Sequence, residues 1–172
     1  MSSCQKNETG TFQMTLSKTK GKCSIGEKVG AEGIRNNYTP VISCEGACIR
    51  GEIARLAANY ISKEEGYSRG CHGELFTVPD SKIARWIKSA DRVVCIDGCF
   101  LKCHSRILEN IINSSRLLVY DALSYYKKYN DIFDIDDVPE DERKRVAWRV
   151  GQWVLESIKK GETPLMSTSC SG

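Results

Sequence analysis

The sequence predicts an α/β fold, a small three-layer domain in which helices flank a mostly parallel sheet of about four strands. Short apolar runs alternate along the chain with amphipathic helical patterns, which is typical of parallel sheets with helical connections. Residues 93–96 are apolar without a break, as expected for a central strand that helices cover on both faces. A chain of 172 residues is long enough to bury one sizeable core, so a single folded domain is expected.

Residues 41–44 are the first predicted strand, a short apolar run that follows a proline. Gly46 and Gly51 flank the turn from this strand into a helix over about residues 50–63, which Gly66 ends. The apolar residues of this helix recur at the spacing of one helical face: Ile53, Leu56, Ala57, Tyr60 and Ile61.

The residue pattern in the middle of the chain predicts two further strands and two helices. Residues 67–78 weakly indicate a short second strand, and a helix is predicted after Asp80, an acceptable N-cap. The apolar face of that helix consists of Ile83, Trp86, Ile87 and Ala90. Residues 92–96 are the clearest strand. They lead into the turn Asp97-Gly98-Cys99 and then into a helix that is predicted to end at about residue 112.

Residues 117–120 are the last predicted strand. The aromatic segment after it is expected to pack over the sheet edge, and it contains Tyr125, Tyr126, Tyr129 and Phe133. A final helix is predicted to begin near Pro139 and to end at Gly161. Its first turn is acidic and its last turn carries lysines, which agrees with the helix dipole.

The predicted α/β domain occupies residues 38–161. Residues 1–37 are rich in Gly, Lys and Ser and show little periodicity, so a loosely structured N-terminal arm is expected there. Residues 162–172 are expected to form a flexible tail.

Composition argues against two classes of partner. The net charge is only +3 and the Lys and Arg residues are scattered, so nucleic acid is not expected to bind. No apolar run approaches the ~20 residues that span a bilayer, and the N-terminus lacks the apolar core of a secretory signal. We therefore expect a cytoplasmic protein without membrane contact, and the sequence leaves a protein partner open.

Nine cysteines are the most informative feature for function. In a reducing compartment such a number favours metal ligation or thiol chemistry over a disulfide framework. Two strand-to-helix turns carry the same Cys-x3-Cys spacing and a Cys-His pair lies between them: Cys44 and Cys48, Cys71 and His72, Cys99 and Cys103. Because the carboxyl ends of neighbouring parallel strands open into one crevice, we expect these thiols to converge.

The turns themselves favour thiolates. If each second cysteine lies one turn inside its helix, both sulfurs of a pair share one face, where the helix N-terminus lowers the thiol pKa. Gly98 lets backbone amides approach sulfur, and Asp97 is placed to orient a ligand. Arg50 and Lys102 can offset the negative charge.

The cysteines divide by their predicted positions. Those at strand ends are the candidate metal ligands: Cys44, Cys71, Cys99 and Cys103. The residues beside them are candidate cofactor-binding residues: Cys48, Cys95, Asp97 and Gly98. Cys95 lies mid-strand, where a core role is the commoner one. Three cysteines in segments of little predicted structure are interpreted as incidental: Cys4, Cys23 and Cys170. His72 and His104 each follow a cysteine, and a ligand role is the minor alternative for them.

Four thiolates suffice for a tetrahedral zinc site and equally for an iron–sulfur cluster. The chain has no Cys-x2-Cys knuckle, which argues against zinc ribbons, RING-like modules and thioredoxin active sites. The cysteines in excess of four favour a cluster, or a metal site beside a reactive thiol. Both cofactors stay open on these residues, with zinc as the first expectation and an iron–sulfur cluster as the alternative.

The two turns, Cys44-Glu-Gly-Ala-Cys48-Ile-Arg-Gly51 and Val94-Cys-Ile-Asp-Gly-Cys-Phe-Leu-Lys-Cys103, resemble the DGC-domain family, which takes its name from the Asp-Gly-Cys motif. The resemblance covers roughly residues 40–125. It implies zinc binding through four cysteines, which correspond here to Cys44, Cys71, Cys99 and Cys103. This chain differs by its Cys48 and its additional Cys95.

Three functions remain open at this point. The first is a closed zinc site of four thiolates, which leaves no position for water and is structural or storage-like. The second is an iron–sulfur enzyme or carrier that acts in sulfur handling or electron transfer. The third is thiol redox sensing through a reversible bond between Cys99 and Cys103. No catalytic residue is assigned, and whether the protein is an enzyme stays open.

Overall fold

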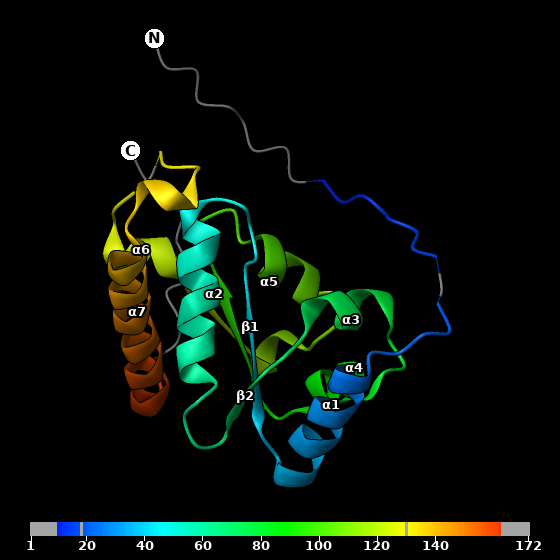
Figure 1. Cartoon of the computed structure of the whole chain (residues 1–172). Helices are drawn as coiled ribbons and strands as arrows, with labels where there is room; N and C mark the ends of the chain where they lie inside the picture. Colours follow the sequence, from blue (N-terminus) through cyan, green and yellow to red (C-terminus); the bar gives the residue numbers. More distant parts are fainter. Residues whose placement is uncertain (1–9, 18, 130, 163–172) are drawn as a thin grey trace.

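The computed structural model describes residues 10–17, 19–129 and 131–162, and its centre is a parallel sheet between two helical layers (Figure 1). The strands are β1 (Thr39–Ser43), β2 (Tyr67–Arg69), β3 (Val93–Asp97) and β4 (Leu117–Asp121). They form a 4-stranded sheet in the order β2-β1-β3-β4, and every pair of neighbours is parallel. The predicted fold class, a small α/β domain, is confirmed.

The helices have the following bounds: α1 (Ser24–Asn36), α2 (Ile49–Ile61), α3 (His72–Thr77), α4 (Lys82–Ser89), α5 (Cys103–Leu108), α6 (Ala122–Tyr126) and α7 (Glu140–Lys160). Two short 3₁₀ turns lie at η1 (Ser114–Arg116) and η2 (Ile135–Asp137). In Figure 1, α2 and α7 stand on one side of the sheet, and α1, α3, α4 and α5 on the other.

Alternation along the strands explains the two layers. Val41 of β1 points into a core that α2 and α7 complete, whereas Ile42 points into the core under α3, α4 and α5. Successive side chains of a strand point to opposite faces, so a run of apolar residues is needed to fill both cores. All five residues of β3 are buried, in agreement with its predicted central position.

Helix α1 is the main departure from the sequence prediction, which expected a loosely structured arm over residues 1–37. Residues 10–17 are exposed and outside any helix or strand, as expected, but Ser24–Asn36 is helical and packs on α4. The buried residues of α1 are glycines: Gly26, Gly30 and Gly33. Gly30 lies against the backbone of Ile83, and Gly33 lies against the ring of Trp86. A buried face built from glycine carries no hydrophobic pattern, so periodicity could not find this helix.

Two boundaries also differ. The N-cap of α4 is Ser81, whose hydroxyl accepts a hydrogen bond from the Ala84 amide at 3.2 Å, and not the expected Asp80. Helix α5 ends at Leu108, before the expected residue 112. Gly161 ends α7 in the left-handed conformation, as its position in the sequence predicts. The expected tail over residues 162–172 lies, after Glu162, outside the described residues.

The chain adds β2 on one side of β1 and then β3 and β4 on the other, so the strand order reverses between β1 and β3. From β1 the chain passes through α2 to β2 at one edge, then returns through α3 and α4 to β3 on the other side of β1. Helix α2 leaves β1 on one face, and α5 leaves β3 on the other. Open parallel sheets bind ligands in the crevice at such a switch point, outside the carboxyl ends of the strands.

Candidate functional site

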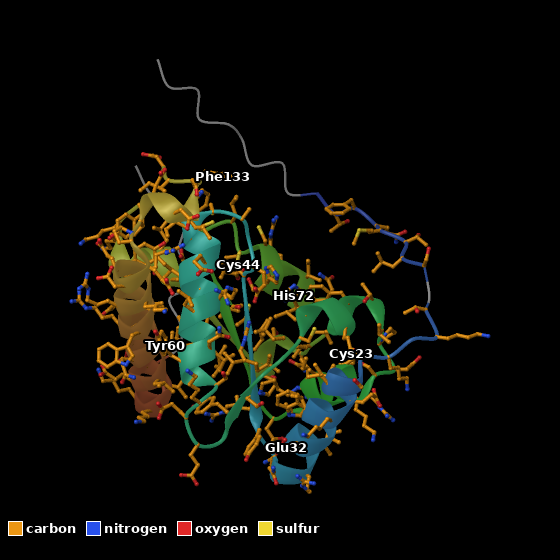
Figure 2. The ribbon with its side chains drawn as sticks, in the orientation of Figure 1. Cys23, Glu32, Cys44, Tyr60, His72 and Phe133 are labelled. Carbon is orange, nitrogen blue, oxygen red and sulfur yellow. The ribbon has the colours of Figure 1, made fainter. Side chains whose placement is uncertain are left out.

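The loops that carry cysteines follow three adjacent strands. Cys44 comes directly after β1, Cys71 follows β2, and Cys99 follows β3. The amide of Cys44 donates to the carbonyl oxygen of Ile96 at 2.8 Å, which continues the β1–β3 pairing into the loop. Figure 2 labels Cys44 at the end of β1 and His72 at the start of α3. The three loops therefore meet at one end of the sheet.

Cys44 lies half-buried just beyond the carboxyl end of β1, at the switch point of the sheet. Its sulfur accepts a hydrogen bond from the Gly46 amide at 3.4 Å and also faces the Gly98 amide. Burial raises the pKa of Cys44, the two amides lower it in part, and the nearby Asp97 and Cys103 raise it again. The pairing of Cys44 with Ile96 of β3 places the loop after β1 beside the end of β3.

Cys71 and Cys103 stand at the starts of two helices that abut. Cys71 is the N-cap of α3 and Cys103 is the first residue of α5, and both side chains are exposed. The neighbouring rings of His72 and His104 are in edge-to-face contact, with centroids 4.7 Å apart. Burial lowers the pKa of both imidazoles. Because the two rings touch, the cysteines that precede them in the sequence lie at the adjoining starts of α3 and α5.

Cys48 lies beside Arg50 at the start of α2, and Cys99 follows Gly98, whose backbone packs against the same turn of α2. The expectation that each second cysteine lies one turn inside its helix is wrong, because Cys48 is the N-cap of α2 and Cys103 opens α5. Burial raises the pKa of Cys48, but the amides of Gly51 and Arg50 and the Arg50 guanidinium outweigh it and leave the pKa below its ordinary value. Arg50 also interacts electrostatically with Cys99.

The two residues before Cys99 each support a different helix: Asp97 supports α5 and Gly98 packs against α2. Asp97 is only 1% exposed, and its carboxylate accepts hydrogen bonds from the amides of His104 at 3.0 Å and Ser105 at 3.3 Å. It thereby caps α5. Gly98 lies against α2, where an added Cβ would be 2.8 Å from the Arg50 carbonyl oxygen. Close approach, not a left-handed conformation, therefore requires glycine here.

Two of the remaining cysteines lie within the described residues, one in the core and one at a helix start that the sequence did not predict. Cys95 is fully buried in the core beneath α4 and α5, with its sulfur 3.9 Å from Asp97 Oδ2. Cys23 is exposed at the N-cap of α1. Cys4 and Cys170 lie outside the described residues.

Sequence reasoning missed the ion pair between Arg69 and Glu45. Arg69 Nη2 donates to Glu45 Oε1 at 2.7 Å and to Ser43 Oγ at 3.0 Å, and Nη1 donates to the Val41 carbonyl oxygen at 3.0 Å. This links the loop after β1 to β2. The Glu45 carboxylate acts on the pKa of both His72 and His104. Only the weak strand pattern of residues 67–69 could have indicated it.

The thiols thus share one end of the sheet without a closed ligand set. Within residues 10–17, 19–129 and 131–162, no three side chains of His, Cys, Asp or Glu lie close enough together to hold a metal ion. Cys44 packs against the core under α2 and α7, and Cys48 is the N-cap of α2, whereas Cys71 and Cys103 lie at the starts of α3 and α5.

A family model for the DGC domain matches residues 40–148. The chain belongs to the DGC-domain family. The match runs from β1 into α7, so it includes every cysteine loop of the site and confirms the resemblance inferred from the two turns. No curated protein and no solved structure matches this DGC-domain chain. Among the helices that the structure describes, none has both the length and the apolar character required to cross a bilayer.

The two half-buried thiols that follow β1 are expected to react differently. At pH 7.5, with metal removed by a chelator, iodoacetamide should alkylate Cys48 several-fold faster than Cys44, because a lowered pKa leaves more thiolate and a raised pKa leaves less. Peptide mass spectrometry over time gives both rates. Of these two thiols, the Arg50→Gln variant should slow only Cys48, since it removes the guanidinium from that sulfur. Equal rates in the unchanged protein would contradict the assigned electrostatics.

Proposed function

We propose that this DGC-domain protein binds a metal ion, zinc in the first instance, through Cys44, Cys71, Cys99 and Cys103. The observation that carries the proposal is the sheet order, since the loops after β1 and β3 flank the switch point and the loop after β2 adjoins β1. A reducing compartment such as the cytoplasm would keep these thiols available.

The donor set fits zinc in its chemistry. Four cysteine sulfurs are the usual ligands of a closed structural zinc site, and zinc imposes no geometric preference beyond its tetrahedral shape. The sulfur of Cys44 already receives the amides of Gly46 and Gly98, and Arg50 lies beside Cys99, so negative charge on sulfur is offset from both sides.

Binding requires the side chains to turn toward one another. Cys71 and Cys103 are exposed and follow short loops, so rotation of their side chains meets little packing. Cys44 and Cys99 are partly buried and would form the fixed half of the site. A closed set of four thiolates would supply structural stability to the loops and leave no open position for catalysis.

Anaerobic purification followed by elemental analysis tests the proposal. Colourless protein with about one zinc per chain is the expected result. Brown protein with absorbance near ~400 nm and bound iron and sulfide would replace zinc by an iron–sulfur cluster at the same cysteines. Metal-free protein that neither takes up added zinc nor gains thermal stability from it would refute metal binding.

A further inference from the structure

Arg69 is the last residue of β2, and its side chain contacts the end of β1 and the loop that follows it. Its guanidinium donates from Nη1 to the Val41 carbonyl oxygen at 3.0 Å. Its Nη2 donates to Ser43 Oγ at 3.0 Å and to Glu45 Oε1 at 2.7 Å. The planar fork of a guanidinium can reach three acceptors in this way, whereas a lysine ammonium has a single nitrogen. One side chain thus joins three alternate residues of the neighbouring strand and loop.

Ser43 completes this network from inside the protein. It is 0% exposed, and its hydroxyl donates to Glu45 Oε1 at 2.9 Å while it accepts the bond from Arg69. A hydroxyl has one proton and two lone pairs, so both bonds can form at once. Bonds to a guanidinium or a carboxylate are stronger than those between neutral groups. The three side chains therefore fix the shape of the loop after β1.

The network flanks two of the proposed ligands. Cys44 lies between Ser43 and Glu45 in the sequence, so both of its neighbours are held by the same guanidinium. Cys71 comes two residues after Arg69. Arg69 is therefore the side chain that ties the loop of one ligand to the strand that leads to the other.

Backbone pairing continues up to both cysteines. Val41 of β1 pairs with Arg69 of β2, and the Gly70 amide donates to the Val41 carbonyl oxygen at 2.9 Å, so the chain stays beside β1 up to the residue before Cys71. The amide of Cys44 is bonded to β3 on the other side. The side-chain network thus acts on two backbone positions that the sheet already holds close.

Two simpler roles for Arg69 leave part of this geometry unexplained. A counter-ion for the thiolates would need only a charge, but two of the three bonds of Arg69 go to an uncharged carbonyl and an uncharged hydroxyl. An ion pair that only stabilises the fold is also a poor explanation. Arg69 and Glu45 are 27% and 28% exposed, and partly exposed pairs contribute little to stability.

We propose that Arg69 is a positioning residue for the metal site: through Ser43 and Glu45 it fixes the backbone at Cys44 relative to Cys71, so that one metal ion can bind both sulfurs. This inference rests on the proposed function, because it names the residue that prepares two of the four ligands. Ligands that are held in place before binding lose less conformational freedom when the metal binds.

The Arg69→Lys variant tests the role, since it keeps the charge and removes the fork. Its zinc affinity, measured by competition with a zinc-binding dye on anaerobic protein, should fall by about 10–100-fold, the usual contribution of groups that orient metal ligands. Co²⁺ bound in place of zinc gives a spectroscopic readout. The thiolate-to-cobalt charge-transfer absorption per bound cobalt should weaken, because fewer sulfurs reach the metal. Loss of a merely structural residue would lower the melting temperature and leave this spectrum unchanged.

Arg55→Lys is the matched control, because Arg55 makes a two-bond pair with Glu52, at 2.8 and 3.0 Å, within α2. It should keep both the zinc affinity and the cobalt spectrum of the unchanged protein. Full zinc affinity in Arg69→Lys would overturn the proposal, and so would equal losses in the two variants.

A readout without metal separates this inference from the proposed function. Dibromobimane alkylates two neighbouring thiols with loss of two bromide ions, and peptide mass spectrometry identifies the bridged pair. In a Cys48→Ser background the reagent should bridge Cys44 and Cys71, and adding Arg69→Lys should lower the yield several-fold. Bridging that depends on Arg69 in a protein that takes up no zinc would refute the proposed function alone. Zinc uptake with equal bridging in both proteins would overturn the positioning role alone.

Discussion

The Gly51→Ala variant is expected to melt about 4–8 °C below the unchanged protein, which corresponds to a loss of about 2 kcal/mol in unfolding free energy for a chain of this size. An added Cβ at position 51 would fall inside contact distance of the Gly46 carbonyl oxygen and amide. Both neighbours are backbone atoms, so neither can move aside as a flexible side chain could. Thermal and urea denaturation measure the loss.

Gly151→Ala provides the matched control for this variant. Gly151 is also a buried helical glycine, but an added Cβ there would lie 3.5 Å from its nearest neighbours, the Ala57 carbonyl oxygen and the Tyr60 Cβ, which is ordinary contact. Helix propensity favours alanine by up to about 1 kcal/mol at both positions. Gly151→Ala should therefore be neutral or stabilising. Equal destabilisation in the two variants would show that the loop contact is not the cause.

The Cys44→Ser variant is expected to lose zinc affinity by more than about 100-fold, since even partners that only orient a ligand contribute 10–100-fold. Serine keeps the size of the side chain but removes the thiolate. Cys99→Ser should have the same effect, because both residues belong to the partly buried half of the site. Competition with a zinc-binding dye on anaerobic protein gives the affinities.

Cys23→Ser serves as control, because Cys23 is an exposed cysteine at the start of α1 and lies outside the proposed ligand set. Its zinc affinity should match that of the unchanged protein. A similar loss in Cys23→Ser and Cys44→Ser would contradict the division between ligands and incidental thiols. Retention of full affinity in Cys99→Ser alone would remove Cys99 from the ligand set and leave the other three.

Local patterns were sufficient for most of the sheet and its flanking helices. The apolar run of β3, the one-sided helix α2, and the acidic start and glycine end of α7 each reflect interactions within a few residues, which a sequence displays directly. Helix α1 was not predicted, because its buried side is made of glycines that fit against α4. Such a helix depends on the shape of its neighbour and has no hydrophobic stripe.

By itself, the sequence determined that strands end in cysteines and that the chain belongs among DGC domains, because strand patterning and the Asp-Gly-Cys turn are local. Only the tertiary structure decided how the thiols group. It placed the end of β1, with Cys44, beside the end of β3, and it placed Cys71 and Cys103 at the starts of two helices whose histidine rings touch. That grouping follows from the reversal of chain direction between β1 and β3, which sends α2 and α5 to opposite faces.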